Sequence, residues 1–254
     1  MALIVVPARL ASHRLPGKPL LAETGRALVV HVVERLRACR QATRVIVATD
    51  DAAIVAAVEA AGGEAMMTSP DHPSGTDRVA EVARAIDGDP VVNVQGDEPE
   101  IDPAHVDRLI EALLADPDVA IATLAAPIES DAAFADPNVV KVVCDGQSRA
   151  LYFSRAPIPH RRDRQDRDDR GAAPLRHAGV YAFRREALFA LTDAAPTPLE
   201  RAERLEQLRA LEHGRPIRVV VVGAVAPGID TRDQYDAFVA RERARSGSST
   251  PRSV

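Results

Sequence analysis

The segment ALIVVPARLASHRLPGKPL, residues 2–20, joins an apolar run to a loop that carries three cations. Residues 2–6 are apolar without interruption, which is typical of a strand buried on both faces of a parallel sheet. The loop that follows carries Arg9, Arg14 and Lys18. Because ligands of open α/β sheets bind where strands end, this loop is predicted to hold phosphate groups. Taken alone, it also fits an ordinary basic surface loop.

Short apolar runs and helical patterns alternate through the rest of the first half. After residues 2–6, the runs predicted to be strands are 45–48, 64–67, 91–94 and 119–124. Between them, Val29, Val32, Val33 and Leu36 recur with helical spacing, Asp51 is placed to cap a helix, and Asp102-Pro103 begins another. This alternation predicts an α/β fold, with a mostly parallel sheet and helices on both faces.

The second half of the chain has a different pattern. Strands are predicted at 139–144, 150–153, 177–183 and 217–222, without regular helices between the first three. Thr197-Pro198-Leu199-Glu200 has the pattern of a capping box, and Leu205, Leu208 and Leu211 then form a helical stripe. Thr231 and Gln234 are expected to cap a last helix. Residues 161–170 are expected to form a mobile charged loop, and 246–254 a disordered tail.

Composition narrows the class of protein. The chain has 254 residues, a formal net charge of −5 and 3% aromatic residues without tryptophan, which argues against a nucleic-acid partner. Cys39 and Cys144 are far apart, so neither a disulfide framework nor a zinc site is expected. The N-terminus lacks the pattern of a signal peptide or a membrane span, which predicts a cytoplasmic protein without a membrane partner. The length fits one domain over residues 1–245.

Two aspartates follow predicted strands. Asp97 comes after 91–94 in the sequence QGDEP, and Asp230 comes after 217–222 and a Pro-Gly turn. Mg²⁺ prefers a few carboxylate oxygens together with phosphate oxygens and water, so both aspartates are candidate ligands of one Mg²⁺ ion. Each of them, taken alone, also fits an ordinary turn or cap residue.

Neither of two familiar phosphate-binding patterns occurs, since GxxxxGK[ST] and GxGxxG are both missing. A nicotinamide oxidoreductase is therefore a weak alternative. The small-residue turn 71–78 leads into a helix instead. There Ser74 is either an ordinary N-cap or part of a site in which backbone N–H groups read a base or a phosphate.

Seven segments in chain order resemble a single family: PARLASHRLPGKPL, DHPSGTDR, NVQGDEP, YFSRAPIP, RHAGVY, PLERAERLEQLR and GIDT. They are similar to the 3-deoxy-manno-octulosonate (Kdo) cytidylyltransferases over nearly the whole chain, to about Arg243. The resemblance implies a Rossmann-like nucleotidyltransferase fold, with a smaller inserted α+β lobe at roughly 125–215 that makes a homodimer contact. It implies transfer of CMP from CTP to Kdo, with release of pyrophosphate, for lipopolysaccharide biosynthesis.

The resemblance also implies a role for each matching residue. Asp97 and Asp230 would bind the Mg²⁺ cofactor, and the catalytic set would add Arg9, Arg14 and Lys18. The residues implied to bind the nucleotide are Pro7, Ala8, Arg9, Arg14, Lys18, Ser74, Gly75, Arg78 and Gln95. Those implied to bind the sugar are Gln95, Arg155, His177, Tyr181, Glu206 and Gln207. From the sequence alone, His177 also fits a structural histidine, and Glu206 fits a solvated helix face.

Two positions depart from the family pattern. Pro73 stands where the family often has Gln, so one polar contact of the nucleotide loop is expected to be absent. His160-Arg161 stands where an aromatic and an acidic residue are common, which leaves the detail of that loop open. Neither departure falls on a predicted metal or phosphate ligand.

Two further interpretations remain at this stage. The acylneuraminate cytidylyltransferases share the opening strand and the basic loop, but they lack RHAGVY and LEQLR, so another acidic sugar such as N-acetylneuraminate is the first alternative. The second is a nucleotide-binding module without catalysis. The presence of both Asp97 and Asp230 beside the cationic loop argues against the second interpretation.

Overall fold

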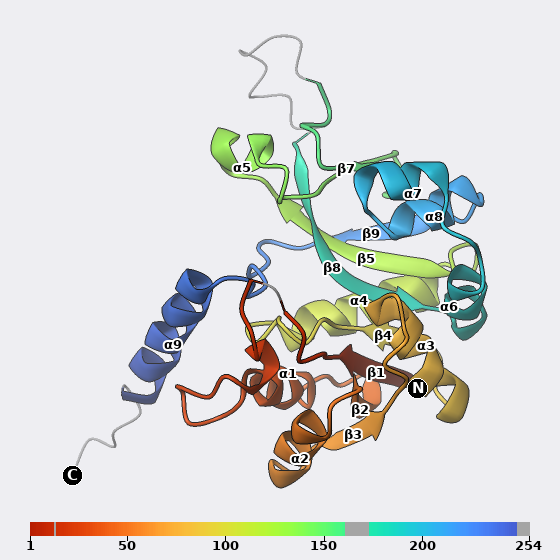
Figure 1. Ribbon diagram of the computed structural model, residues 1–254. Coiled ribbons are helices and arrows are strands. Elements are labelled where there is room, and N and C mark those ends of the chain that lie inside the picture. The colour runs from red at the N-terminus through yellow and green to blue at the C-terminus, as the bar shows by residue number, and fades with distance from the viewer. Residues whose placement is uncertain (13, 161–172, 248–254) are drawn as a thin grey trace, which may run out of the picture.

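The computed structural model describes residues 1–12, 14–160 and 173–247. The described strands form one nine-stranded sheet (Figure 1). Its main path runs in the order β3 (Glu64–Met67), β2 (Ala42–Thr49), β1 (Ala2–Pro7), β4 (Val91–Asn93), β8 (Leu175–Phe183), β5 (Ile121–Pro127) and β9 (Ile217–Val221). Strand β6 (Lys141–Cys144) pairs with β8 and with β7 (Ala150–Ser154), so residues of the expected lobe extend the same sheet.

The sheet is parallel across its first four strands and mixed beyond them. β1 pairs in parallel with both β2 and β4, and β2 pairs in parallel with β3. β8 then runs antiparallel to both β4 and β5, while β9 is parallel to β5. The carboxyl ends of β1 and β4 therefore lie side by side, at the edge where open α/β sheets bind ligands.

Helices cover both faces of the sheet, as the sequence predicts. Ile4 and Val6 of β1 pack in one apolar cluster, while Leu3 and Val5 pack in the other, because successive strand residues point to opposite faces. The first cluster includes residues of α1 (Leu28–Leu36), α2 (Ala52–Ala60) and α4 (Pro103–Ala115). The second includes residues of α3 (Gly75–Ala85), α6 (Arg185–Thr192) and α8 (Gln207–Glu212). Burial on both faces explains why the early strands are apolar throughout.

Three local expectations need correction. The strand expected at 119–124 begins two residues later and continues to Pro127. The leucine stripe after the capping box does not lie on one helix, because α7 (Pro198–Glu203) ends before Arg204, which has a left-handed backbone with φ of 53°. Leu205 lies in the connection that follows, and Leu208 and Leu211 lie in α8. Glu206 therefore lies at the N-terminus of α8 and not on a continuous helix face. The short helix α5 (Asp131–Ala135) was not expected.

The last helix, α9 (Arg232–Gly247), packs against the N-terminal loop (Figure 1). Leu15 and Leu28 form a third apolar cluster with Tyr235 and Phe238 of this helix. The Tyr235 hydroxyl also accepts a hydrogen bond from the backbone N–H of Glu23 at 3.0 Å. These contacts hold the last described helix against the chain segment that follows β1.

Two expectations concern residues at the limits of the description. Helix α9 runs two residues into the expected tail, and the rest of that tail, 248–254, lies outside the described residues. The charged loop expected at 161–170 also lies outside them. Among the helices that are described, none is long and apolar enough to cross a membrane.

Candidate active site

A cleft at the carboxyl ends of β1 and β4 consists of two adjoining cavities. The loop half has a volume of about 690 Å³ and lies between the loop 8–19 and the turn 70–75. The sheet half has a volume of about 660 Å³ and is lined in part by β8. Both cavities are lined by Arg14, Gln95, Asp97 and Asp230, so the two halves meet at these four residues.

The junction holds a cation between two carboxylates. The Lys18 ammonium lies 2.6 Å from Asp97 Oδ2 and 3.2 Å from Asp230 Oδ1. Arg14 Nη2 lies 2.9 Å from the other oxygen of Asp230. The Lys18 side chain is only 13% exposed, so its pairing with the carboxylates is less screened than a surface ion pair. The two aspartates, 133 positions apart in sequence, thus converge on one point as the sequence analysis expects.

Two glycines shape the backbone that carries this junction. Gly17 adopts a left-handed conformation with φ of 68° and begins the short 3₁₀ helix η1 (Lys18–Leu20), which sets the direction of Lys18. Gly96 donates from its backbone N–H to the Pro7 carbonyl at 3.3 Å. A Cβ atom on residue 96 would lie 2.9 Å from that carbonyl oxygen, so only glycine fits without a shift of the backbone. Asp97 is therefore held close to the end of β1.

Asp230 is fixed by the segment that begins the last helix. The backbone N–H of Ile229 donates to the Asp97 carbonyl at 2.9 Å, which joins the two aspartate segments. The Gln234 side chain accepts from the backbone N–H groups of Asp230 and Thr231, at 2.7 and 3.0 Å. Gln234 N–H in turn donates to Thr231 Oγ1 at 3.3 Å. The expected cap of α9 is thus confirmed, and it is the cap that orients Asp230.

All of the residues implied to bind the nucleotide line the loop half: Pro7, Ala8, Arg9, Arg14, Lys18, Ser74, Gly75, Arg78 and Gln95. Arg78 is 4% exposed and bonds to the Thr68 hydroxyl, with Nη2 3.4 Å from Asp50. It is therefore held in the wall of the cavity. Pro73 lines the same cavity and offers no side-chain polar group there.

The turn 71–78 leads into α3 through a confirmed N-cap. Ser74 Oγ accepts from the backbone N–H of Asp77 at 3.2 Å. Gly75 packs against the proline that ends β1, since a Cβ there would lie 3.3 Å from the Pro7 ring. The N-terminus of α3 consequently faces the loop half, and its first N–H groups favour a negatively charged or polar ligand.

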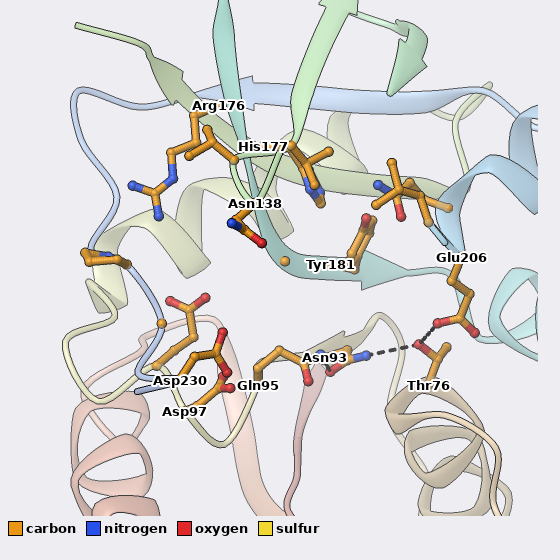
Figure 2. A pocket seen from close by; sticks show the side chains of 18 of the residues that line it. Thr76, Asn93, Gln95, Asp97, Asn138, Arg176, His177, Tyr181, Glu206 and Asp230 are labelled. Carbon is orange, nitrogen blue, oxygen red and sulfur yellow. Dashed lines mark hydrogen bonds between the residues drawn. The ribbon is translucent and has the colours of Figure 1, made fainter. Parts of the chain in front are cut away.

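A chain of hydrogen bonds runs from the junction along the sheet half (Figure 2). Gln95 Nε2 donates to Asn93 Oδ1 at 3.0 Å, and Asn93 Nδ2 donates to the Thr76 hydroxyl at 3.4 Å. Thr76 then donates to Glu206 Oε2 at 2.7 Å. Asn93 is 1% exposed and Thr76 is 7% exposed, so this network is largely sealed from water. It ties Gln95 and Glu206, two of the residues implied to bind the sugar, to one framework.

Several polar groups of the sheet half have unused bonding capacity. Within the described residues, the Tyr181 hydroxyl and Gln207 Nε2 are buried without a hydrogen-bond partner. Burial raises the pKa of Tyr181 well above its usual value, Glu206 adds to the rise, and the Thr123 side chain acts against it. Burial also raises the pKa of Glu206, although Thr76 and Ser74 donate to its carboxylate. Buried groups without partners are costly, so both unsatisfied groups are suited to a polar ligand.

His177 lines the same cavity from β8 and is uncharged at neutral pH. Burial lowers the pKa of its imidazole to about 3. Its ring packs edge-on against Phe153 at 5.0 Å and lies 5.4 Å from the Tyr181 ring. His177 is therefore both a packed side chain and a cavity residue, so the two interpretations of its sequence position are compatible.

The expectation for Arg155 is not supported by its position. Arg155 lines neither half of the cleft. Its guanidinium donates to the backbone carbonyls of Glu203 at 2.8 Å and Pro137 at 3.1 Å, and its backbone N–H donates to the Glu203 side chain at 2.9 Å. The arginine therefore joins the end of α7 to the segment before β6, and its planar group is used for this structural link.

The sheet half contains residues that the sequence analysis did not assign. They include Thr76, Asn93, Glu98, Asn138 and Arg176. Thr76, Asn93, Glu98 and Arg176 lie inside the quoted segments DHPSGTDR, NVQGDEP and RHAGVY, so the signal that could have found them was present. Asn138 lies in no quoted segment. Burial raises the pKa of Glu98 to about 8, and Arg176 acts against that rise.

Comparison with known proteins agrees with this geometry. Residues 3–217 match the family model described as cytidylyltransferase. The chain is 48% identical over 241 residues to a 3-deoxy-manno-octulosonate cytidylyltransferase of Geobacter metallireducens, covering 92% of this chain and 95% of the relative. It is 47% identical over 232 residues to the enzyme of the same name from Syntrophotalea carbinolica, covering 89% and 92%.

A solved structure is also similar over nearly the whole chain. It is a CMP:2-keto-3-deoxy-manno-octonic acid synthetase complexed with CTP, and it superposes with a TM-score of 0.89 at 43% identity. The match covers 96% of this chain and 99% of that one. The expected fold is thereby confirmed.

Proposed function

The chain belongs to the cytidylyltransferase family, and from this premise we propose that it transfers CMP from CTP to 3-deoxy-manno-octulosonate and releases pyrophosphate. The observation that carries the proposal is the meeting of two cavities at Asp97 and Asp230, with Lys18 between the carboxylates. A reaction that joins a nucleotide to a sugar needs two binding volumes with a common boundary, where charge on phosphate is neutralised.

We assign the loop half to CTP. Its cations Arg9, Arg14 and Lys18 would bind phosphate oxygens, and the N-terminus of α3 at Ser74 and Gly75 would face the cytidine. Gln95 lies at the boundary and would contact the base or the ribose. Arg78 forms part of the wall of this cavity, where its contacts with Thr68 and Asp50 hold it in place.

Asp97 and Asp230 are the residues that would hold Mg²⁺. Among the described residues, no three His, Cys, Asp or Glu side chains cluster to hold a metal by themselves. A pair of carboxylates fits Mg²⁺, because this ion is usually bound by one or two carboxylates plus substrate phosphates and water. The Lys18 ammonium between the two aspartates supports the same view, since it shows that the site favours positive charge. Bound Mg²⁺ would polarise phosphate oxygens and offset charge in the transition state.

The reaction is a single displacement at phosphorus. A hydroxyl of Kdo attacks the α-phosphorus of CTP, a new oxygen–phosphorus bond forms, and the bond to the leaving pyrophosphate breaks. The hydroxyl proton leaves to solvent or to an acceptor at the junction. Arg9, Arg14 and Lys18 would stabilise the charge that develops on pyrophosphate. The shared boundary at Asp97 brings the two substrates into contact.

We assign the sheet half to Kdo. Tyr181, Glu206, Gln207 and His177 offer the mixed donors and acceptors that a polyhydroxylated sugar requires. An acidic sugar also needs a cation for its carboxylate, and the described cations lining this half are Arg14 and Arg176. Because Arg14 pairs with Asp230, we assign the carboxylate to Arg176 in place of Arg155.

We also propose, from the family resemblance, a cytoplasmic homodimer. One feature of the surface supports a second subunit: Leu151 on β7 is 63% exposed, and the described partner of β7 in the sheet is β6. Light scattering after size-exclusion chromatography would test this, with a mass near twice the 27.2 kDa of the chain expected. A mass near 27.2 kDa would contradict the dimer.

One assay tests the reaction, the sugar and the metal together. Pyrophosphate release is measured from CTP and Mg²⁺ with Kdo, with N-acetylneuraminate and without sugar. We expect pyrophosphate release only in the reaction that contains Kdo, and we expect that release to be lost when EDTA removes Mg²⁺. Release with N-acetylneuraminate alone would overturn the sugar assignment, whereas CTP binding without any release would favour a non-catalytic module.

A further inference from the structure

Thr123 lies behind the sheet half and contacts a residue that lines it. This β5 threonine is fully buried, with 0% exposure, and does not itself line the cleft. Its hydroxyl oxygen lies 3.0 Å from His177 Nε2, 2.8 Å from the Val180 carbonyl oxygen and 3.2 Å from the Ala178 carbonyl oxygen. Three polar atoms of β8 therefore surround one hydroxyl.

The contact arises from an irregularity in the pairing of β5 with β8. Thr123 lies opposite Tyr181, but the next residue, Leu124, lies opposite Ala178. Two residues of β8, Gly179 and Val180, are therefore extra and form a bulge. The bulge turns the carbonyl groups of Ala178 and Val180 toward the Thr123 hydroxyl, which bonds to groups that the regular ladder would otherwise pair.

The number of hydrogens decides the direction of these bonds. A threonine hydroxyl carries one hydrogen and accepts through two lone pairs, whereas a carbonyl oxygen only accepts. The single hydrogen must point toward the carbonyl oxygens, because oxygen atoms 2.8 Å apart without a hydrogen between them would repel. The Thr123 oxygen is then an acceptor toward His177, so the imidazole must carry its hydrogen on Nε2.

We propose that Thr123 is a positioning residue that fixes His177 as the neutral Nε2–H tautomer, so that Nδ1 accepts a hydrogen bond from a sugar hydroxyl. The proposal rests on the assignment of the sheet half to Kdo. His177 lines that half, and the low pKa that burial gives its ring agrees with the uncharged state. Nδ1 of His177 thus accepts a hydrogen bond from a sugar hydroxyl, and the sugar carboxylate pairs with a different residue, Arg176.

The first test observes the tautomer directly and does not depend on activity. Long-range ¹H–¹⁵N NMR of uniformly labelled full-length protein distinguishes protonated from unprotonated imidazole nitrogens, and His177→Asn assigns the signal among the seven histidines. We expect a protonated Nε2 and an unprotonated Nδ1 at pH 7. A proton on Nδ1, or on both nitrogens, would overturn the proposal.

The second test compares Thr123→Val, which removes the hydroxyl, with Thr123→Ser, which keeps it. Loss of one hydrogen bond predicts a KM for Kdo about 2- to 10-fold higher in Thr123→Val, with the KM for CTP unchanged. The NMR signal of His177 should shift toward the other tautomer. Thr123→Ser should restore both properties.

These outcomes separate the proposal from a structural role and from the function itself. A wild-type KM for Kdo in Thr123→Val with an unchanged tautomer would overturn the proposal. If Thr123→Val does not fold, Thr123→Ser and the wild-type spectrum still test the tautomer. If the wild-type protein does not use Kdo, the proposed function fails, but the tautomer result stands.

Discussion

The two halves of the cleft are formed by different kinds of structural element. The loop half is lined mainly by two continuous stretches, residues 7–19 from the end of β1 onward and residues 70–78 at the start of α3. Asp50, residues 95–97 and Asp230 complete it. The sheet half is assembled from β8, α8, the segment before β6 and the turn before α9. A continuous motif carries its own geometry, whereas an assembled cavity depends on how distant elements pack.

The two halves also differ in charge. Arg9, Arg14 and Lys18 surround the loop half, which suits a polyanion. Glu206 and Glu98 line the sheet half beside an uncharged His177, which suits a neutral hydroxyl-rich body. Few described cations line this half, so we expect recognition of an acidic sugar to depend on Arg176.

The largest loss of activity is expected from a change at Asp97, because this side chain lines both halves of the cleft. Asp97→Asn keeps the size of the residue but removes the charge that faces Lys18 and the proposed metal. We expect turnover to fall by about 100-fold or more, because metal-linked charge stabilisation contributes several kcal/mol to catalysis. The measurement is steady-state pyrophosphate release with Kdo, CTP and Mg²⁺.

The matched control is Asp118→Asn, which changes an exposed aspartate that lines neither half of the cleft. It should have wild-type turnover. Near-normal activity in Asp97→Asn would exclude this residue as a metal ligand.

A methyl group at the junction should act on the geometry of both halves without changing charge. Gly96→Ala places a Cβ 2.9 Å from the Pro7 carbonyl oxygen, so the segment that carries Asp97 must shift. A misplacement of about 1 Å costs on the order of 100-fold in rate, and we expect kcat to fall by about 10- to 100-fold. Gly146→Ala, where no atom lies within 4 Å of the new Cβ, is the control. Equal activity of the two variants would show that the close approach of residue 96 is unimportant.

A smaller effect is expected on the binding of one substrate only, which distinguishes the sheet half from the loop half. Arg176→Gln removes the cation assigned to the sugar carboxylate, so we expect the KM for Kdo to rise about 10-fold while the KM for CTP stays constant. Arg155→Gln breaks the link between Glu203 and Pro137, and should lower the melting temperature more than it changes either KM. The opposite result, with Kdo affinity lost only in Arg155→Gln, would return the carboxylate to Arg155.

The smallest effect concerns the pH dependence of folding. The His177 imidazole has an ordinary pKa of 6.5, which burial lowers to about 3 in the folded protein. The unfolded chain therefore binds a proton there below pH 6.5 while the folded protein does not, so stability falls as the pH decreases. This residue should contribute a slope of about 1.4 kcal/mol per pH unit between those two values.

Urea unfolding of wild-type protein and His177→Asn at pH 7 and pH 5 measures this contribution. The variant should lose less unfolding free energy between the two pH values. An equal loss in both proteins would mean that the ring is accessible to protons in the folded state.

The sequence predicts the loop half and the sheet-forming strands more fully than the sheet half. Residues 2–6 are apolar at every position and residues 91–94 at all but Asn93, so strand type and burial follow from the local pattern. The break at Arg204 and the bulge opposite Thr123 have no comparable signal, because both result from packing between distant elements. Arg155 shows the same limit: its motif is present, but the long-range contacts decide where the guanidinium points.

The pairing of the first loop with the segment that begins the last helix determines when the junction can form during translation. Lys18 and Asp230 lie 212 positions apart. At a translation rate of about 5–20 residues per second, the ribosome makes the second aspartate roughly 10 to 40 s after the lysine. During that interval the nascent chain has the opening strand, the cationic loop and Asp97, but no partner from the last helix to complete them. The junction therefore cannot be completed before Asp230 is synthesised, and a chain cut short before Asp230 would hold all nine described strands without the finished junction.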